Sequence, residues 1–279
     1  MSSPSTFEDY IQTDACDLYV RRSGSGPTVL FFNGSGASIA STQFLLDQLA
    51  ESLDLIVLDQ RGLGKSTIPP TPWTMADYAR DAKHVLEYFD IDQCGVMGMS
   101  FGGMVALEFA VTFPEVISRL CLWCTSAGGS AGSSYPLHTL GDKDPDERRR
   151  ISRMLTDERF TDEWLEEHPI EKSLMTFIEQ AALEPVSIER QMGLDAQLSA
   201  RSGHDVADRL EFITAPTFIG CGRFDGLAPL GNSEALHKRI MDSTLKVYEG
   251  GHMFFVQDTG ALPDAVSFLA SSRTRREPS

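Results

Sequence analysis

Residues 94–104 read CGVMGMSFGGM, and they combine the end of a buried strand, a tight turn and the start of a helix. The apolar run that opens the segment is typical of a strand buried on both faces of a parallel sheet. Gly98, Gly102 and Gly103 let the backbone turn closely around Ser100. The helix that follows, MVALEFAV, directs the positive end of its dipole toward an anion formed at the serine. This context makes Ser100 the candidate nucleophile.

The same Gly-x-Ser-x-Gly pattern occurs again at Gly128–Gly132, around Ser130. Ser130 also follows an apolar segment, but the residues after it, AGSSYPLH, include a proline and have no helical periodicity. A nucleophile on a tight turn needs a helix directly behind it. We therefore interpret Ser130 as a linker residue.

Apolar strand-like segments alternate with helical segments on both sides of Ser100. Such alternation predicts the α/β class, with a mostly parallel central sheet flanked by helices. Thr74 and Asp77 form a capping-box pattern at the start of one helix. The strands expected in this first part are 17–22, 28–32, 53–59, 94–98 and 118–126, and the helices are 41–52, 75–89 and 101–113.

The strand signal stops between residues 128 and 208, where a Gly/Ser-rich start precedes helical segments at 146–155, 161–168, 170–183 and 186–201. The alternation then resumes with strands at 215–222 and 244–251 and helices at 232–241 and 261–272. The sequence thus predicts one α/β core, built from 1–127 and 209–279, with a helical insertion at 128–208. The last few residues are expected to be frayed.

Composition narrows the class of protein. The chain has 279 residues and a formal charge of −16, which argues against binding to a nucleic-acid backbone. No apolar run reaches the length of a membrane span, and the N-terminus has no secretory pattern. Five irregularly spaced cysteines suggest free thiols in the cytoplasm. The basic clusters Arg148–Arg150 and Arg273–Arg276 stand beside acids and are interpreted as solvated faces.

A serine hydroxyl becomes a strong nucleophile only when a base removes its proton and a third group orients that base. In chains with this kind of turn, an acid and then a histidine follow the serine, each after a buried strand. Asp225 lies shortly after the apolar segment 217–221, and His252 follows the segment 245–248. We therefore predict that Ser100, Asp225 and His252 form a catalytic triad.

The anion formed when the serine attacks a carbonyl needs preorganised N–H donors. One is expected from Phe101, directly after the nucleophile, and the other from Ser35 in the loop FFNGSGAS. Gly34 and Gly36 allow that loop to turn inward.

Apolar residues flank these positions and are predicted to form the wall of a substrate pocket. They are Phe32, Met99, Trp123, Met253 and Phe254. For Phe32 and Trp123, core packing is an equally good interpretation. No arginine of the insertion stands out as a partner for a substrate carboxylate.

Patterns for metals and cofactors are missing from the sequence. Cys121–Cys124 reads CLWC but lies within an apolar strand, and the histidines have no metal-ligand spacing. Gly64-Lys65-Ser66 lacks the spacing of a phosphate loop, so Arg61 nearby is expected to connect loops instead. We predict no metal and no cofactor.

Five segments together resemble the α/β-hydrolase superfamily over essentially the whole chain: NGSG (33–36), DQRGLGKS (59–66), GMSFGG (98–103), GRFDGLAP (222–229) and GGH (250–252). DQRGLGKS and GMSFGGMVALEFA are most similar to the 3-oxoadipate enol-lactonase and small carboxylesterase group. NGSG and GRFDGLAPL also resemble the C–C bond hydrolases of aromatic degradation. The resemblance implies that the insertion forms a helical cap over the pocket. The family usually has His where this chain has Asn33, and an amide is expected to order the loop as well.

These observations predict a serine hydrolase that cleaves a carboxylic ester or lactone of a small apolar substrate through an acyl-enzyme on Ser100. One alternative is hydrolysis of a C–C bond in a vinylogous diketone by the same triad. Another is a small-molecule signal receptor that turns its ligand over slowly. The sequence does not fix the oligomeric state.

Overall fold

The computed structural model describes residues 6–181 and 185–271. Their strands form one sheet of 8 strands in the order β1-β2-β4-β3-β5-β6-β7-β8. The strands are β1 (Phe7–Gln12), β2 (Asp17–Gly24), β3 (Thr28–Phe32), β4 (Asp54–Leu58), β5 (Cys94–Met99), β6 (Ile117–Trp123), β7 (Thr217–Gly222) and β8 (Ser243–Tyr248).

The sheet is mostly parallel. All neighbours from β4 to β8 run in the same direction, whereas β2 is antiparallel to both β1 and β4. The edge strand β1 is absent from the sequence-based prediction. Its residues FEDYIQ are mainly exposed, so it lacks the apolar run that marks the inner strands.

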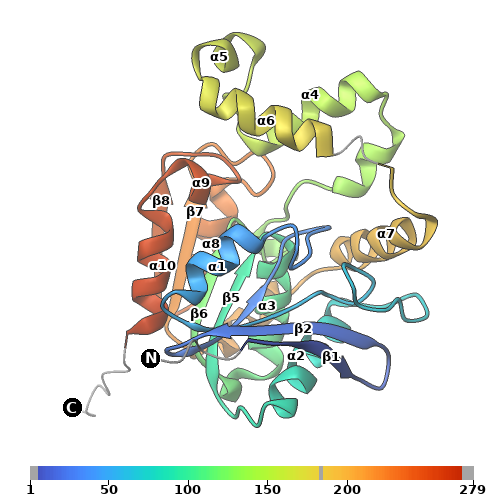
Figure 1. Cartoon of the computed structure of the whole chain (residues 1–279). Helices are drawn as coiled ribbons and strands as arrows, with labels where there is room; N and C mark the ends of the chain where they lie inside the picture. Colours follow the sequence, from blue (N-terminus) through green and yellow to red (C-terminus); the bar gives the residue numbers. More distant parts are fainter. Residues whose placement is uncertain (1–5, 182–184, 272–279) are drawn as a thin grey trace.

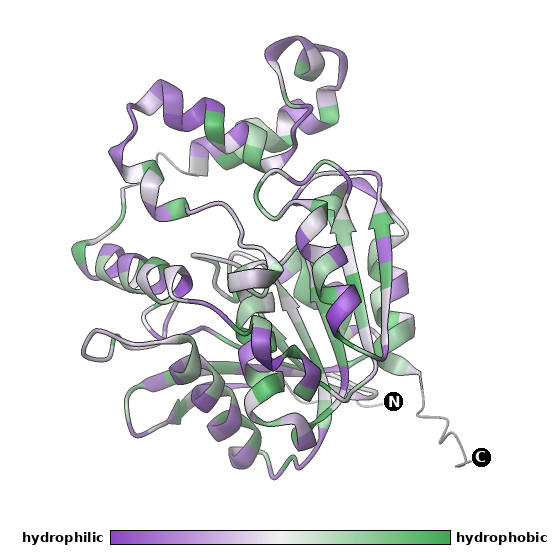
Figure 2. Cartoon of the chain, turned by 180° about the vertical axis from the view of Figure 1, so that it is seen from behind, coloured by the Kyte–Doolittle hydropathy of each residue, from purple (hydrophilic) through white to green (hydrophobic). Residues whose placement is uncertain are grey.

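Helices cover both faces of the sheet (Figure 1), and the pleat divides the core between them. On β3, Leu30 and Phe32 pack into one apolar cluster with α2 (Met75–Tyr88) and α3 (Phe101–Thr112). Val29 and Phe31 face the opposite cluster, with α1 (Gln43–Ala50) and α10 (Ala261–Ala270). Figure 2 shows the strands as mainly hydrophobic and the outer surfaces of the helices as mainly hydrophilic. Each large apolar side chain fully buried here contributes about 1.5–3 kcal/mol.

The predicted elements agree with the observed ones to within a few residues. The capping box forms at Thr74, whose backbone N–H donates to Asp77 at 2.6 Å. The remaining helices are α4 (Pro145–Thr156), α5 (Asp162–Glu167), α6 (Pro169–Ala181), α7 (Ile188–Ser202), α8 (Leu230–Arg239) and α9 (Phe254–Gln257). Residues 182 and 183 of one predicted helix and the predicted frayed end lie outside the described residues.

The predicted insertion has two structurally different parts. Helices α4, α5 and α6 lie above the sheet, whereas α7 lies lower, beside the core (Figure 1). Phe160, Leu165 and Met175 form a small apolar cluster within the upper part. The boundaries 128–208 remain a prediction, but the structure separates a raised cap of α4 to α6 from a helix that joins the core.

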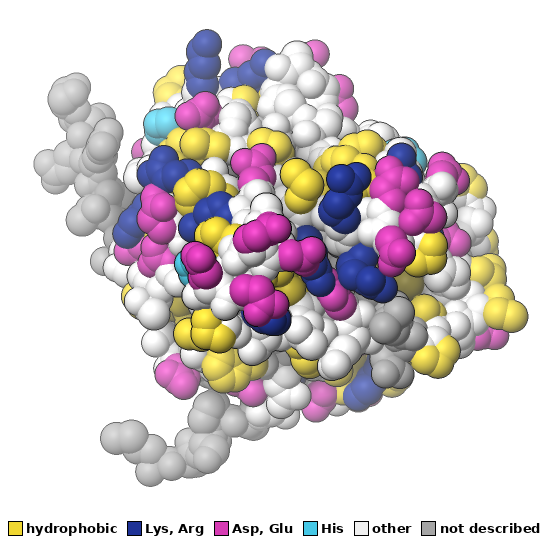
Figure 3. Space-filling model, turned by 90° about the horizontal axis from the view of Figure 1, so that it is seen from above, with side chains coloured by type: hydrophobic (Ala, Val, Ile, Leu, Met, Phe, Trp, Pro, Cys, Tyr) yellow, Lys and Arg dark blue, Asp and Glu magenta, His cyan; other side chains and the backbone are white. Residues whose placement is uncertain are grey.

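Charged side chains are paired as the sequence suggests. Arg61 donates to both carboxylate oxygens of Asp81 at 2.7 Å and so connects its loop to α2. Within the basic cluster, Arg149 pairs with Asp146. Seen from above (Figure 3), acidic and basic side chains are interspersed with hydrophobic ones. Across the described part of the chain, no helix has the length and apolar character needed to span a bilayer.

Candidate active site

Ser100 lies on a sharp turn between β5 and α3, with φ 55° and ψ −117°. Non-glycine residues rarely adopt a positive φ, so the surrounding structure must hold this conformation. The backbone is tightly packed around it: a Cβ at Gly102 would lie 2.1 Å from the Phe32 carbonyl oxygen, and one at Gly98 would lie 2.2 Å from that of Gly102. These glycines are therefore required by close contact, as the sequence predicts.

The three residues predicted to act together meet in the structure. His252 Nε2 lies 2.9 Å from Ser100 Oγ, and its Nδ1 lies 2.8 Å from Asp225 Oδ2 and 3.0 Å from Oδ1. Asp225 is 2% exposed, and the His252 side chain is 14% exposed. This geometry allows a proton to pass from the hydroxyl to the imidazole while a buried carboxylate fixes the ring.

Backbone groups hold the acid and the histidine in place. Asp225 Oδ1 accepts hydrogen bonds from the N–H groups of Leu227 and Ala228 at 2.9 and 2.7 Å. The His252 N–H donates to the carbonyl of Thr156, at the end of α4, at 2.6 Å. The cap thus touches the loop that carries the histidine. Sequence reasoning missed this contact because a backbone carbonyl leaves no side-chain signal.

The two predicted oxyanion donors, Phe101 and Ser35, belong to two different segments near Ser100. Phe101 opens α3 and Ser35 lies in the loop after β3, and neither N–H donates a hydrogen bond within the described residues. A Cβ at Gly34 would lie 3.7 Å from that of Ser100, so this loop passes close to the nucleophile. Both N–H groups are thus free to bind an anion, and their role as oxyanion donors stays a prediction.

Asn33 is 1% exposed and connects the loop to its surroundings. Its Oδ1 accepts from the Thr42 hydroxyl at 2.9 Å, and its carbonyl accepts from Gln60 Nε2 at 2.8 Å. The side-chain amide thus bonds through its oxygen, whereas its buried Nδ2 has no partner within the described residues.

The loop is also held from α7. The Gly36 N–H donates to Gln197 Oε1 at 2.8 Å, and Arg190 donates to the Gly36 carbonyl at 2.6 Å. Gln197 and Arg201 are buried on the same face of α7 as Gly193 and Ala200. Sequence reasoning missed both polar residues, although polar side chains on the apolar face of an amphipathic helix were a usable signal.

The residues predicted for the pocket wall separate into two groups. Phe32, Trp123 and Phe254 are at most 1% exposed and pack in the core, where Trp123 contacts the Phe254 ring. We no longer assign these three to the wall, because their side chains fill the space against the sheet. Met99 is 9% exposed and lies near Gly34. Met253 lines a pocket together with His252.

The pocket beside His252 has a volume of about 280 Å³. It lies between the cap and the core, and apolar side chains form most of its wall: Leu137, Leu140, Leu155, Ile178, Leu227 and Met253. A small apolar group fits a space of this kind.

One group of potential metal ligands overlaps the triad. Within the described residues, ligand atoms of Cys124, Asp225 and His252 lie within 4.8 Å of one another. Burial, followed by the charge of Asp225, raises the pKa of the Cys124 thiol well above its usual value, which favours the neutral thiol. The acid and the histidine already bond each other, so we interpret the group as part of the triad.

Comparison with known proteins agrees with this architecture. A family model described as "alpha/beta hydrolase fold" matches residues 27–259. The chain belongs to this family. As an α/β-hydrolase, it has the expected mostly parallel sheet with helices on both faces and a helical insertion.

Individual α/β-hydrolases are similar over nearly the full length. A poly(3-hydroxyalkanoate) depolymerase of Ectopseudomonas oleovorans is 28% identical over 258 residues, which cover 88% of this chain and 86% of that protein. A 2-hydroxymuconate semialdehyde hydrolase of Pseudomonas sp. strain CF600 is 28% identical, covering 90% and 89%. The crystal structure of the enol-lactonase from Burkholderia xenovorans LB400 superposes with a TM-score of 0.77 at 18% identity, covering 94% of this chain and 100% of that chain.

Proposed function

We propose that this α/β-hydrolase is a serine hydrolase that cleaves carboxylic esters or lactones of small substrates through an acyl-enzyme on Ser100. The observation that carries the proposal is the continuous contact from Ser100 Oγ through His252 to Asp225, at 2.9 and 2.8 Å, on a strained turn. A hydroxyl in this setting has both a base, the His252 imidazole, and a carboxylate that orients that base.

The reaction follows from these contacts. His252 Nε2 takes the hydroxyl proton as Ser100 Oγ attacks the substrate carbonyl, and Asp225 stabilises the imidazolium that forms. His252 then gives the proton to the leaving oxygen, and the C–O bond breaks. A water molecule, deprotonated by the same imidazole, releases the acid and restores Ser100. The sequence of steps needs no cofactor.

The negative charge on the tetrahedral intermediate would be bound by the N–H groups of Ser35 and Phe101. Neither N–H has another partner in the described part of the chain, which supports this role because a donor that is already engaged cannot stabilise a developing anion. The dipole of α3, which starts at Phe101, adds to the same effect. A donor of this kind contributes about 10²–10³-fold in kcat.

The pocket beside His252 supports a small apolar group on one side of the scissile bond, with Leu137, Leu227 and Met253 as its contacts. Similarity to a depolymerase and to an enol-lactonase supports ester or lactone substrates. All five cysteines are buried and form no disulfide, which supports work in a reducing compartment such as the cytoplasm.

The experiment is a turnover assay with matched substrates on the wild-type protein and on Ser100→Ala. The panel contains methyl esters of increasing acyl length, several lactones and a vinylogous diketone. We expect turnover of an ester or lactone that Ser100→Ala loses by at least about 10³-fold. Preference for the diketone would replace the proposal with C–C bond hydrolysis. Tight binding of a small ligand without turnover would favour a receptor.

A further inference from the structure

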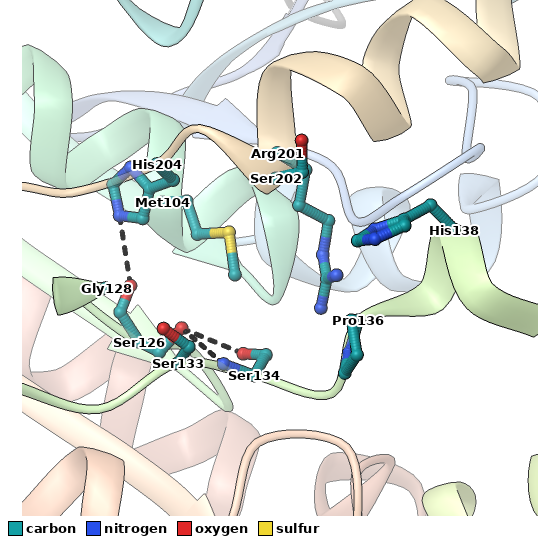
Figure 4. Close-up of a pocket in the computed structure, with 10 residues that line it drawn as sticks. All are labelled: Met104, Ser126, Gly128, Ser133, Ser134, Pro136, His138, Arg201, Ser202 and His204. Atoms are coloured by element: carbon teal, nitrogen blue, oxygen red, sulfur yellow. Dashed lines mark hydrogen bonds between the residues drawn. The ribbon is translucent and has the colours of Figure 1, made fainter.

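A second pocket lies beside α3, between Met104 and Arg201 (Figure 4). Its volume is about 290 Å³. Met104 lines it from α3, and the Met104 N–H bonds the Ser100 carbonyl at 3.2 Å. Ser126 lines it from the loop after β6, directly after Thr125, whose hydroxyl bonds the same carbonyl at 2.8 Å. The pocket is therefore next to the turn that presents Ser100.

Arg201 of α7 points its guanidinium into this pocket, toward the space that Met104 and His138 also face (Figure 4). The residue is 7% exposed. Its Nη1 donates to the Tyr135 carbonyl at 2.8 Å, whereas its buried Nε has no hydrogen-bond partner. Within the described residues, Arg201 forms no ion pair.

Other arginines in this chain show what the unpaired edge of Arg201 can bind. Arg22 holds Asp54, Arg61 holds Asp81 and Arg159 holds Asp157, and each uses Nε and Nη2 together against the two carboxylate oxygens. This side-on fork matches the geometry of a carboxylate. In Arg201 the Nη1 contact to a carbonyl leaves the same Nε–Nη2 edge without an acceptor.

The surroundings of Arg201 favour an anion. Among the residues that the structure describes, no Asp or Glu lines the pocket, although the whole chain has a formal charge of −16. Its polar lining consists of hydroxyls and imidazoles, among them Ser133, Ser202 and His138. Burial lowers the pKa of Arg201 to about 10, so the guanidinium remains charged at neutral pH. A buried, charged and unpaired guanidinium gains most from a ligand that brings the missing charge.

We propose that this pocket is a carboxylate subsite, in which Arg201 binds an anionic group at one end of the substrate while Ser100 attacks a carbonyl at the other. The inference rests on the proposed function and specifies its substrate class: monoesters or lactones that carry a free carboxylate. The apolar pocket at Met253 then receives the uncharged part. No insertion arginine stands out for this role in the sequence, and the proposal rests on the contacts of Arg201 in the structure.

The test compares monomethyl esters of straight-chain dicarboxylic acids, from succinate to suberate, with the dimethyl esters of the same acids. Each pair differs only in one free carboxylate, and the series samples the spacing between Ser100 and Arg201. For at least one chain length we expect kcat/KM of the wild-type protein to be tenfold or more higher for the monoanion. A wild-type preference for the neutral diester at every length would overturn the proposal.

Variants test whether Arg201 causes the preference for the monoanionic ester. Arg201→Gln is expected to lower kcat/KM for the best monoanion by tenfold or more. The kcat/KM for the corresponding diester should change less than threefold. For the monoanion, kcat/KM of Arg201→Lys should lie between those of the wild type and Arg201→Gln. The control is Arg150→Gln, which removes the same charge from an exposed position of α4 and should leave kcat/KM for both substrates unchanged. An equal loss for both substrates in Arg201→Gln would show a structural role only and would overturn the proposal.

A binding measurement tests the carboxylate subsite independently of the proposed hydrolase function. Ser100→Ala, titrated calorimetrically with the same pairs of esters, should bind the monoanion at least tenfold more tightly than the diester. If no ester is turned over by the wild type but this preference is seen, the proposed hydrolase function fails and the subsite stands. Equal binding of both esters by Ser100→Ala would overturn the subsite proposal. This outcome does not depend on whether Arg201→Gln folds.

Discussion

The N–H of Gly36 donates to Oε1 of Gln197 at 2.8 Å, which joins two residues 161 positions apart in the chain. Gly36 lies in the candidate oxyanion loop, and Gln197 is buried on α7. Gln197 Nε2 also reaches Gln60, which in turn bonds the Asn33 carbonyl. The position of the Ser35 N–H therefore depends on a helix of the insertion.

Replacing Gln197 by Leu removes the acceptor for the Gly36 N–H. Because the loop then loses its fixed position, we expect kcat for the best ester to fall by about 10–100-fold, with a smaller effect on KM. Gln191→Leu is the matched control, since Gln191 is exposed on the same helix. A Gln197→Leu variant with wild-type kcat would show that α7 does not position the loop.

Asp225→Asn keeps an oxygen for the N–H groups of Leu227 and Ala228 but loses the charge that stabilises the His252 imidazolium. We expect kcat to fall by about 10³–10⁴-fold with little change in thermal stability. Steady-state kinetics and thermal denaturation measure the two effects. Asp258→Asn, which changes a turn carboxylate bonded to the Gly260 N–H, serves as the control. A loss below tenfold would argue against the role of Asp225.

Gly102→Ala tests the packing of the turn. The added Cβ would lie 2.1 Å from the Phe32 carbonyl oxygen, and backbone cannot move aside cheaply. We expect the free energy of unfolding to fall by at least about 2 kcal/mol. At Gly231, near the start of α8, a Cβ meets nothing within 4 Å. Gly231→Ala should leave the stability unchanged or raise it by up to about 1 kcal/mol. Urea denaturation of both variants makes the comparison.

We expect the folded protein to lose stability in mild acid because of the buried side chain of His204. Its Nε2 contacts the Ser126 carbonyl at 3.1 Å, and its buried Nδ1 has no partner. Burial lowers the pKa of His204 from 6.5 to about 4, against the opposing effects of Glu108 and Asp205. Because the unfolded chain takes up the proton at higher pH, the stability gained from neutral His204 is complete above pH 6.5 and is lost as the pH falls to 4.

The loss amounts to about 3 kcal/mol for a shift of this size. Equilibrium denaturation of the wild type and of His204→Gln, which retains a donor for Ser126, should show a weaker dependence on pH in the variant over this range. His237→Gln, at an exposed position, is the control and should follow the wild type. Identical pH profiles for wild type and His204→Gln would contradict the assignment.

The inner part of the fold could be predicted because its strands are buried on both faces and read as apolar runs, as in β3 and β5. The edge strand β1 could not, since its residues are mainly exposed and depend on pairing with β2. The division of the insertion also escaped prediction. Whether a helix packs on the core or above it depends on contacts such as Gln197 to Gly36, which are distant in sequence.

The predicted triad residues meet because each follows a strand of the parallel part of the sheet, and parallel strands bring their carboxyl ends to one edge of the sheet. The pocket was harder to predict. Phe32 and Trp123 are the last residues of β3 and β6, the two strands that flank β5, yet their side chains point into the core. Arg201 lies far from Ser100 in sequence and reaches the second pocket only through the packing of α7.

The most direct measurement of the central claim is the site at which a fluorophosphonate reacts with the protein. Peptide mass spectrometry should find the phosphonyl adduct on Ser100 alone, and Ser100→Ala and His252→Ala should lose it while Ser130→Ala keeps it. An adduct on Ser130, or labelling of Ser100 that is as fast without His252 as with it, would contradict activation of Ser100 by the histidine.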